Sequence, residues 1–542
     1  MLTLIFSYFP ILLLIYLMVK KNSMASSKAL PITAFVTYFI MLLIFGQDPN
    51  LIHATVVKGL LVAWTPILII AGAIFLFRTM EATGSLSVIK EWLNTISTNK
   101  VAQLMIVGWA FPFLIEGASG FGTPAAIAAP VLVGLGFSPI RVAILTLIMN
   151  SVPVSFGAVG TPTWFGFSAI SLTEMETLTI GFKSAIMNSA AALFIPPIAL
   201  MFVVKPRGVL KNWLFILLSI IATVAPYIIL ANYSYEFPSL VGGTIGLLVS
   251  VLLAQKGIGL SKEAIELQES DEVEKSISYT DTTKVDQPKA RLNLATATFP
   301  LWGTILLLVL TRIPQLGIKQ LITMTEPALV SSFGFLGNIT ISPALVVGLD
   351  SIFGTSVSWS HAILYVPSLL PFVLISIVAF FLCGVSSKTK PVFKETVAKM
   401  KDPTLALLGA LVFVNLMMMG KEQSAVTAIG NHLAELTGSM WTYAAPFLGA
   451  LGTFFSGSNT ISNLTFGGIQ DAIATELSLN RTTVLAMQSV GGAMGNMVCI
   501  NNIVAIASVL SLVNIEGYIL KRTVRAMLVY GVVVALVAAV FL

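Results

Sequence analysis

The sequence predicts an all-α membrane protein of about 12 transmembrane helices, in two repeat-like halves with broken helices or re-entrant hairpins. Three observations predict this class. Of 542 residues, 56% are hydrophobic and only 10% are charged, against roughly 25% charged residues in a soluble globular domain. The apolar residues arrive in blocks about as long as a helix that spans hydrocarbon. Two long and almost uncharged regions, at 101–175 and 441–511, are interrupted by glycine, proline and small polar residues.

The apolar blocks place the regular helices along the chain. We expect spans at 2–19, 30–46, 59–77, 180–204, 211–231, 239–254, 296–311, 362–383, 403–420 and 526–542. The first block has no basic residue before it and is followed by lysines, the reverse of a cleaved signal peptide, so we expect it to remain as a span. Basic residues gather in loops beside the blocks, and the positive-inside bias places those loops in the cytoplasm and both termini outside.

A polar segment divides the chain into comparable halves. Residues 255–293 carry eight acidic and six basic residues and no sustained apolar period, which is typical of a solvated loop. The expected organisation is a first membrane half at 1–254, a hydrophilic cytoplasmic loop at 255–295 and a second membrane half at 296–542. A Pro-Phe-Leu triplet precedes the glycine-rich break of each irregular region, and paired interrupted segments in corresponding places indicate a transporter built from two repeats.

The first irregular region carries the signal of a membrane helix that stops and restarts. Gly120 and Gly122 let the backbone leave the helical region. Thr123 can then cap a new helix, and Pro124 fits its first turn, where no amide hydrogen is needed. Gly160-Thr161-Pro162 repeats the same signal.

The second irregular region is interrupted in a similar way. The five small or polar residues Ser456-Gly-Ser-Asn-Thr460 break one apolar run, with Ser458 or Asn459 as the cap of the helix that follows. Gly491-Gly492 and Gly495-Asn496 are expected to interrupt another run.

These breaks predict an internal anion site. Free backbone groups are tolerated at membrane depth only where they face protein or a water-filled cavity, so four breaks imply a shared site. Half-helix N-termini suit a carboxylate, and Ser, Thr and Asn side chains suit a hydroxyl group. The alternative is that the glycines only let helices approach closely. The candidate substrate-binding residues are Ser119, Gly120, Gly122, Thr123, Ser456, Ser458, Asn459, Thr460 and Asn496.

Glu116 is the candidate for proton coupling. It is the only charged residue between Lys100 and Arg141 and immediately precedes the first break. An ionisable residue within a membrane is expensive and is usually functional. The alternative is a structural carboxylate whose oxygens accept hydrogen bonds from backbone amides at the break.

Several function classes are disfavoured by what the sequence contains. Cys383 and Cys499 are too few and too far apart for a disulfide scaffold or a metal cluster. His53, His361 and His432 have no second histidine or carboxylate at ligand spacing. We therefore expect no catalytic residues, no metal and no cofactor. The net charge of +6 reflects loops beside membrane spans, so the expected partners are the lipid bilayer and a small organic anion, with no nucleic acid.

Five motifs resemble signatures of the lactate permease family across nearly the whole chain. They are Glu116-Gly-Ala-Ser-Gly-Phe-Gly-Thr-Pro124, Asn150-Ser-Val-Pro-Val-Ser-Phe-Gly-Ala-Val-Gly160, Pro446-Phe-Leu-Gly-Ala-Leu-Gly452, Ser456-Gly-Ser-Asn-Thr-Ile-Ser-Asn463 and Gly491-Gly-Ala-Met-Gly-Asn496. The resemblance implies a multi-pass symporter of a prokaryotic plasma membrane, which takes up L-lactate, D-lactate or glycolate with protons.

The chain departs from this family pattern at two positions. Members of the family tend to carry an acid where this chain has Asn459 and a lysine where it has Asn496. The departure keeps alternatives open: sodium in place of protons, or another small organic anion. A passive anion channel would share the breaks but would not accumulate its substrate. A membrane-embedded enzyme would need a cluster of nucleophile, base or metal ligands within the spans, and the sequence offers none.

Overall fold

The computed structural model describes residues 2–19, 24–120, 123–269, 292–312, 316–366, 369–420, 423–510, 512 and 515–541. Residues 270–291, most of the predicted polar loop, lie outside these ranges. The chain forms two compact units, Met1–Val88 with Ala290–Leu433 (unit 1) and Ile89–Lys289 with Ala434–Leu542 (unit 2). Each unit draws on both halves of the sequence. The predicted division into two repeat-like halves stays a prediction.

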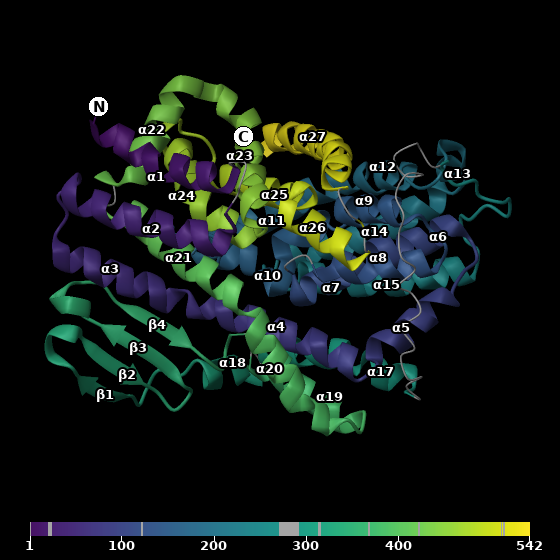
Figure 1. The fold of residues 1–542 in the computed structure, drawn as a ribbon, viewed down its shortest axis with the longest axis horizontal. Coiled ribbons are helices and arrows are strands. Elements are labelled where there is room, and N and C mark those ends of the chain that lie inside the picture. Colours follow the sequence, from purple (N-terminus) through teal and green to yellow (C-terminus); the bar gives the residue numbers. More distant parts are fainter. Residues whose placement is uncertain are drawn as a thin grey trace. The chain divides into compact units, whose positions relative to one another are not determined.

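Unit 1 consists of helices and one antiparallel sheet (Figure 1). Its helices are α1 (Leu2–Val19), α2 (Ser26–Leu43), α3 (Pro49–Val62), α4 (Trp64–Ala82), α17 (Leu294–Arg312), α18 (Ile318–Ile322), α19 (Ile375–Leu382), α20 (Thr389–Lys399) and α21 (Lys401–Met417), with a π-helical segment at Leu369–Leu374. Two further helices, α5 (Ser85–Asn94) and α22 (Ala425–Thr437), run across the boundaries of the units.

The sheet of unit 1 was not predicted from the sequence. Its order is β1 (Leu329–Ser332), β2 (Asn338–Ile341), β3 (Val346–Asp350) and β4 (Trp359–Ala362), each strand pairing with the next. In register, Ile339 faces Leu349, Leu349 faces Trp359 and Val347 faces His361. Short β-branched runs separated by glycine turns are the signal that could have indicated it.

Unit 2 is helical and contains both irregular regions of the sequence (Figure 1). Its elements are α6 (Lys100–Met105), the π-helical η1 (Ile106–Ala110), α7 (Phe111–Ser119), α8 (Thr123–Gly134), α9 (Pro139–Met149), η2 (Val152–Phe156), α10 (Gly157–Trp164), α11 (Glu174–Ala192), α12 (Ile195–Met201), α13 (Pro206–Lys211), α14 (Trp213–Ala231), α15 (Pro238–Gln255), α23 (Trp441–Ser456), α24 (Asn459–Glu476), α25 (Arg481–Gly495), η10 (Asn496–Val498), α26 (Ile500–Val509) and α27 (Glu516–Phe541).

The structure confirms a helical membrane protein with broken helices. Within the described ranges, eight helices are long and apolar enough to cross a membrane, or ten if each of two bent pairs is one span. Three shorter apolar helices, Thr3–Met18, Leu294–Leu308 and Leu370–Leu382, coincide with predicted spans. Counted with the three shorter helices, these spans are close to the predicted number of about 12 helices.

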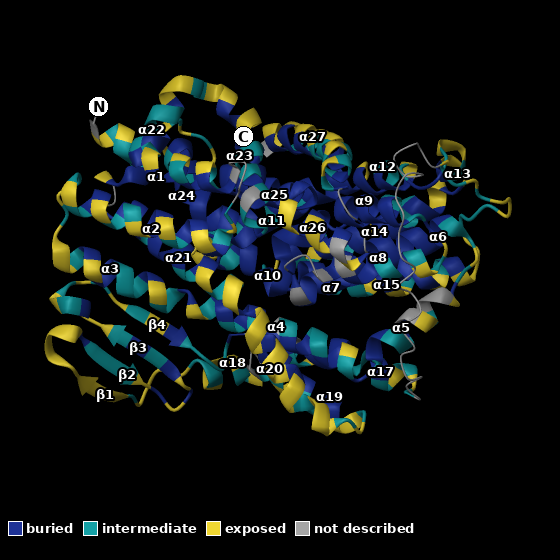
Figure 2. Ribbon diagram, in the orientation of Figure 1, coloured by how far each residue is buried: buried dark blue, intermediate teal, exposed yellow. Residues whose placement is uncertain are grey.

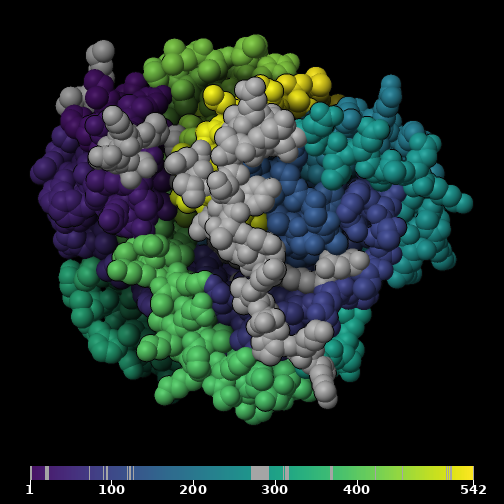
Figure 3. Space-filling model, turned by 45° about the vertical axis from the view of Figure 1, so that its right-hand side comes forward, coloured from purple at the N-terminus to yellow at the C-terminus, as the bar shows by residue number. Residues whose placement is uncertain are grey.

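Burial differs sharply between helices. The window of the span Lys100–Ala118 is completely buried, whereas that of Trp213–Ala231 is 44% buried. Figure 2 shows mostly dark blue along α7, α9 and α25. In unit 1, α19 and α20 expose Phe381, Leu382, Phe393 and Val397, and the green atoms of this part of the chain form part of the surface in Figure 3. Apolar side chains on such helices suit contact with lipid.

Candidate functional site

The first break separates α7 from α8. Gly120 adopts φ +61° and ψ −155°, and its amide donates to the Glu116 carbonyl at 3.0 Å. Only glycine adopts such a conformation at little cost. Helix α8 begins at Thr123, as the sequence predicts. Gly122 lies outside the described residues, and so do the side chains of Ser119 and Thr123.

The second break follows α9 and begins earlier than predicted. Ala158, Val159 and Gly160 adopt φ of 45°, 57° and 70°. For the two non-glycine residues the left-handed region costs roughly 1–2 kcal/mol each. The Thr163 hydroxyl donates to the Ser155 carbonyl at 2.7 Å, and the Trp164 indole donates to the Val159 carbonyl at 3.0 Å. Surrounding contacts therefore hold a strained turn of the kind that occurs at binding sites.

The third break separates α23 from α24, as predicted. Gly457 adopts φ +76°, and the Ser458 hydroxyl caps α24 by accepting from the Ile461 amide at 3.3 Å. The amides of Asn459 and Thr460 belong to the first turn, where no intrahelical acceptor exists. Ser456 instead donates its hydroxyl to the Gly452 carbonyl at 2.7 Å.

The fourth break lies at η10, and the prediction for Gly491-Gly492 is wrong. Helix α25 runs without interruption from Arg481 to Gly495. A Cβ on Gly491 would lie 1.9 Å from the Pro446 carbonyl oxygen, and one on Gly492 would lie 1.8 Å from Asn459 Oδ1. These glycines therefore serve close packing, the alternative stated for glycines in membrane helices.

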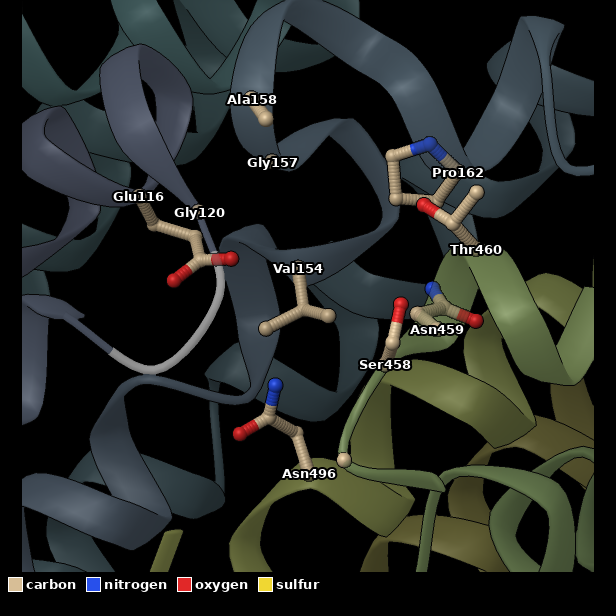
Figure 4. A pocket seen from close by; sticks show the side chains of 11 residues that line it. Glu116, Gly120, Val154, Gly157, Ala158, Pro162, Ser458, Asn459, Thr460 and Asn496 are labelled. Atoms are coloured by element: carbon tan, nitrogen blue, oxygen red, sulfur yellow. The ribbon is translucent and has the colours of Figure 1, made fainter. Parts of the chain in front are cut away.

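The breaks meet around one small cavity within unit 2 (Figure 4). About 20 Å³ of the cavity is open to the centre of a water molecule, which is room for roughly one or two waters. In Figure 4, Glu116 and Gly120 lie on one side, Ser458, Asn459 and Thr460 lie on another, and Val154 stands between them. The lining residues are Glu116, Gly120, Val154, Gly157, Ala158, Pro162, Gly457, Ser458, Asn459, Thr460 and Asn496.

Six of the predicted site residues line this cavity, counting Glu116. The others are Gly120, Ser458, Asn459, Thr460 and Asn496, whereas Ser456 is not among the lining residues. Sequence reasoning missed Val154, Gly157, Ala158, Pro162 and Gly457 as lining residues. Their signal was present, because most of them belong to the two interrupted segments that the sequence analysis identified.

The Glu116 carboxyl group is almost fully buried and has a specific partner. Its side chain is 2% exposed, and Asn150 Nδ2 donates to Oε2 at 3.0 Å. The other oxygen lies beside Gly157, where an added Cβ would approach Oε1 to 2.5 Å. Asn150 was not among the predicted site residues, although a buried amide that ends an otherwise apolar helix is a recognisable signal.

Asn459 and Asn496 both line the cavity. Asn459 Nδ2 donates to the Ser489 carbonyl at 3.0 Å, and Asn496 Oδ1 accepts from Asn502 Nδ2 at 2.6 Å. Among the described lining residues, Glu116 is therefore the single ionisable side chain. Within the described ranges, no group of three or more His, Cys, Asp or Glu residues could hold a metal ion.

A buried hydrogen-bond network supports the second break. Asn188 Nδ2 donates to Ser155 Oγ and to the Tyr227 hydroxyl, both at 3.0 Å. The Tyr530 hydroxyl donates to Asn188 Oδ1 at 2.7 Å. Asn188 on α11 thereby connects η2, α14 and α27, and its side chain is completely buried. A network with every member satisfied gives a membrane core a defined arrangement.

Comparisons with known proteins agree with this description. The family model described as L-lactate permease matches residues 3–542. A Haemophilus influenzae relative, provisionally named an L-lactate permease, is 49% identical over 544 residues, covering 100% of this chain and 99% of the relative. The L-lactate permease of Bacillus subtilis is 28% identical over 86% of this chain and 83% of its own length. The glycolate permease of Escherichia coli is 25% identical over 93% and 90% respectively. The chain belongs to the lactate permease family, and it is a multi-pass membrane transporter and not an enzyme.

Proposed function

We propose that the chain imports lactate, glycolate or a similar small 2-hydroxymonocarboxylate with protons across the plasma membrane of a prokaryote. The relatives named above are permeases for L-lactate and glycolate. The observation that carries the proposal is the cavity in which the start of α24 and the buried carboxyl group of Glu116 face the same space.

The start of α24 supplies the groups that a hydroxy acid needs. The amides of Asn459 and Thr460 are first-turn donors that can bind the substrate carboxylate, with help from the helix dipole. The Thr460 hydroxyl lines the same space and can bind the 2-hydroxyl group.

Proton coupling follows from the charges in the cavity. Two carboxylates in a buried space repel each other strongly, because the surroundings screen little of their interaction. The described lining holds no lysine or arginine to offset a second negative charge. Binding of the substrate anion therefore favours the protonated form of Glu116, so that a proton moves with each anion.

Transport requires the cavity to change its size. Its present volume suits roughly one or two water molecules and not a three-carbon acid. We infer that the structure represents a closed form of the site. Alternating access would open the same site first to one side of the membrane and then to the other.

Uptake of labelled L-lactate into proteoliposomes tests the proposal. We expect accumulation with an imposed pH gradient, and none with a sodium gradient alone or with neither gradient. Glu116→Gln keeps an acceptor for Asn150 but cannot carry a proton. It should abolish accumulation driven by the pH gradient while exchange of labelled for unlabelled lactate persists. Proton-driven accumulation by this variant would overturn the role of Glu116.

Sodium coupling is the second candidate, and one observation favours it. Thr453 Oγ1, Asn459 Oδ1 and Ser489 Oγ are buried without a hydrogen-bond partner. Neutral oxygen atoms of this kind are ligands that a hard cation accepts. Accumulation driven by a sodium gradient at fixed pH, and lost in Asn459→Ala, would replace the proton in the proposal.

A further inference from the structure

A chain of hydrogen-bonded neutral side chains runs through unit 2 and includes none of the residues that line the cavity. It starts at Trp441 on α23, whose indole Nε1 donates to Gln470 Oε1 on α24 at 2.8 Å. Gln470 Nε2 donates to the Ala445 carbonyl at 2.8 Å and to Gln488 Oε1 on α25 at 3.0 Å. The side chain of Gln470 therefore joins three neighbouring helices.

The chain continues from α25 to the second break. Gln488 Nε2 donates to Ser462 Oγ at 3.1 Å and lies 3.4 Å from Asn463 Oδ1, both on α24. Asn463 Nδ2 donates to the Pro162 carbonyl at 2.9 Å, across 301 positions of sequence. This last bond joins the two irregular regions. The side chains of this polar chain are those of Trp441, Gln470, Gln488 and Asn463.

The two ends of the polar chain fix its direction. An indole nitrogen can only donate, and a proline carbonyl can only accept. Trp441 therefore requires the oxygen of Gln470, and the nitrogen of Gln470 then requires the oxygen of Gln488. At the other end, Pro162 requires the nitrogen of Asn463. Each amide thus has one orientation that satisfies its neighbours, and the polar chain holds a single arrangement of the helices that carry it.

The polar chain is deeply buried. Gln470 and Gln488 are completely buried, and Asn463 is 1% exposed. Removing one member would leave its neighbours without hydrogen bonds in a place that water does not reach, which is costly. Apolar side chains of similar size would fill the same space without that risk. A complete polar network therefore serves here to fix one arrangement.

That arrangement concerns the candidate site, because the last bond of the polar chain lies beside the cavity. Pro162 lines the cavity, as do Asn459 and Thr460 at the start of α24. Asn463 lies about one helical turn after Asn459 on the same helix. Figure 4 shows Pro162 on the same side of the cavity as Thr460. The bond from Asn463 to Pro162 therefore holds the start of α24 against the second break.

The backbone of α25 makes a second connection, next to Gln488. The Ser489 carbonyl accepts from Asn459 Nδ2 at 3.0 Å and from Ser155 Oγ at 3.4 Å. Asn459 begins α24, and Ser155 belongs to η2, which leads into the second break. Two consecutive residues of α25 thus form hydrogen bonds that connect the second break and the third.

We propose that Gln488 and Asn463 are positioning residues that set the affinity of the site for its substrate. Neither touches the substrate. Through the polar chain they hold the amides of Asn459 and Thr460 where the substrate carboxylate binds, so that little ordering is left for the moment of binding. This role rests on the proposed function, which assigns the carboxylate to those two amides.

Exchange of labelled for unlabelled lactate, without any gradient, measures the affinity as the half-saturating concentration. Gln488→Met keeps the length of the side chain but removes its acceptor and its donor. We expect the half-saturating concentration to rise by about five- to tenfold, the effect of one lost hydrogen bond, with a maximum rate per folded protein within about twofold of wild type. A merely structural residue would change the amount of folded protein and leave the half-saturating concentration as it is.

Gln103→Met is the matched control. Gln103 is buried in α6, donates through Nε2 to the Ser97 carbonyl at 2.9 Å and does not line the cavity. We expect this variant to keep the half-saturating concentration of wild type. Asn463→Ala removes the last bond of the polar chain and replaces Gln488→Met if that variant does not fold.

Cys499 provides a second measurement that needs no substrate. It is completely buried, and a Cβ on Gly457 would lie 3.5 Å from its Sγ, so it lies at the third break. Cys383→Ser removes the other cysteine of the chain. In that background we expect N-ethylmaleimide to react with Cys499 about five times faster in Gln488→Met than in Gln103→Met, because a loosened start of α24 exposes the thiol more often.

The outcomes separate this proposal from the proposed function. Equal half-saturating concentrations in Gln488→Met and Gln103→Met, or a loss of maximum rate alone in Gln488→Met, would overturn the positioning role. If wild type exchanged neither lactate nor glycolate, the proposed function would fail, and the alkylation rates would still test the polar chain. Faster alkylation in Gln488→Met would then support its hold on the start of α24, and equal rates in the two variants would overturn it.

Discussion

Two cavities, one in each unit, differ in size and lining because different structures form them. The cavity of unit 2 measures about 20 Å³ and is bordered by helix ends, amides and one carboxyl group, whereas that of unit 1 measures about 420 Å³ and is bordered by a sheet face and two helices. Broken helices bring free backbone amides and carbonyls into a buried space. That space must be small and polar so that these groups find hydrogen-bond partners. A sheet packed against helices exposes no free backbone groups on its face, so its cavity can remain large and apolar.

The largest effect is expected from Gly157→Ala, a substitution that disrupts the small cavity. A Cβ there would approach Glu116 Oε1 to 2.5 Å and displace the carboxyl group from the cavity. We expect Gly157→Ala to lower lactate uptake by more than about tenfold, since a small displacement of a positioned group costs that much. Gly134→Ala is the control, because a Cβ at Gly134 meets nothing within 4 Å. Equal uptake by both variants would show that Glu116 need not hold this position.

The next effect concerns the network that supports the small cavity. Asn188→Ala leaves Ser155, Tyr227 and Tyr530 without the hydrogen bonds that Asn188 provides. We expect roughly 3 kcal/mol of lost stability, because buried polar groups become unsatisfied, and thermal unfolding in detergent measures it. Asn415→Ala removes one bond to the Leu411 carbonyl and should cost less. Equal losses of stability in the two variants would mean that the Asn188 network stabilises the protein no more than the single hydrogen bond of Asn415.

A smaller effect comes from the cap of α24. Ser458→Ala removes the acceptor for the Ile461 amide and should cost about 1 kcal/mol of stability, as N-cap substitutions do. Ser458→Asp keeps an acceptor but adds a charge that repels the substrate anion. We therefore expect the aspartate variant to retain stability and lose uptake. If the aspartate variant transported normally, the start of α24 would not bind the substrate.

A further small effect concerns the pH dependence of stability, to which His361 in the large cavity contributes. Burial lowers the pKa of His361 in the folded protein, whereas in the unfolded chain a histidine titrates near about 6.5. The unfolded chain therefore binds more protons below that pH, and stability falls as the pH drops. We expect the stability of His361→Leu to fall less than that of wild type between about pH 7 and pH 5. Parallel curves in thermal unfolding would show that His361 is not buried as described.

The last prediction is that filling the large cavity has no effect on lactate uptake. It tests whether the two cavities are independent. Val347→Phe fills the large cavity and should leave the initial rate of lactate uptake unchanged. Uptake into proteoliposomes beside Val330→Phe, which places the same change on the exposed strand β1, measures this. A specific loss in Val347→Phe would mean that occupancy of the large cavity influences transport.

The candidate site was predictable to the extent that local backbone chemistry decides it. Gly120 and Gly457 can adopt positive φ, and Ser458 can cap a helix, so the first and third breaks are visible in the residues themselves. Gly491 and Gly492 carry the same local signal but lie in a continuous helix. Local sequence cannot tell a glycine that breaks a helix from one that lets another backbone approach, because the neighbour comes from a distant segment.

The sequence by itself determined the membrane class, the order of the apolar helices, the broken segments and Glu116 as the isolated charge. Those features depend on hydropathy, helix length and the conformational freedom of single residues, which act over a few positions. The tertiary structure decided that Gly120, Ala158 and Asn459 border one cavity, that Asn150 donates a hydrogen bond to Glu116, and that β4 places His361 in the lining of a second cavity in unit 1. These contacts join residues far apart in the chain, and packing selects among alternatives that local preferences leave equal.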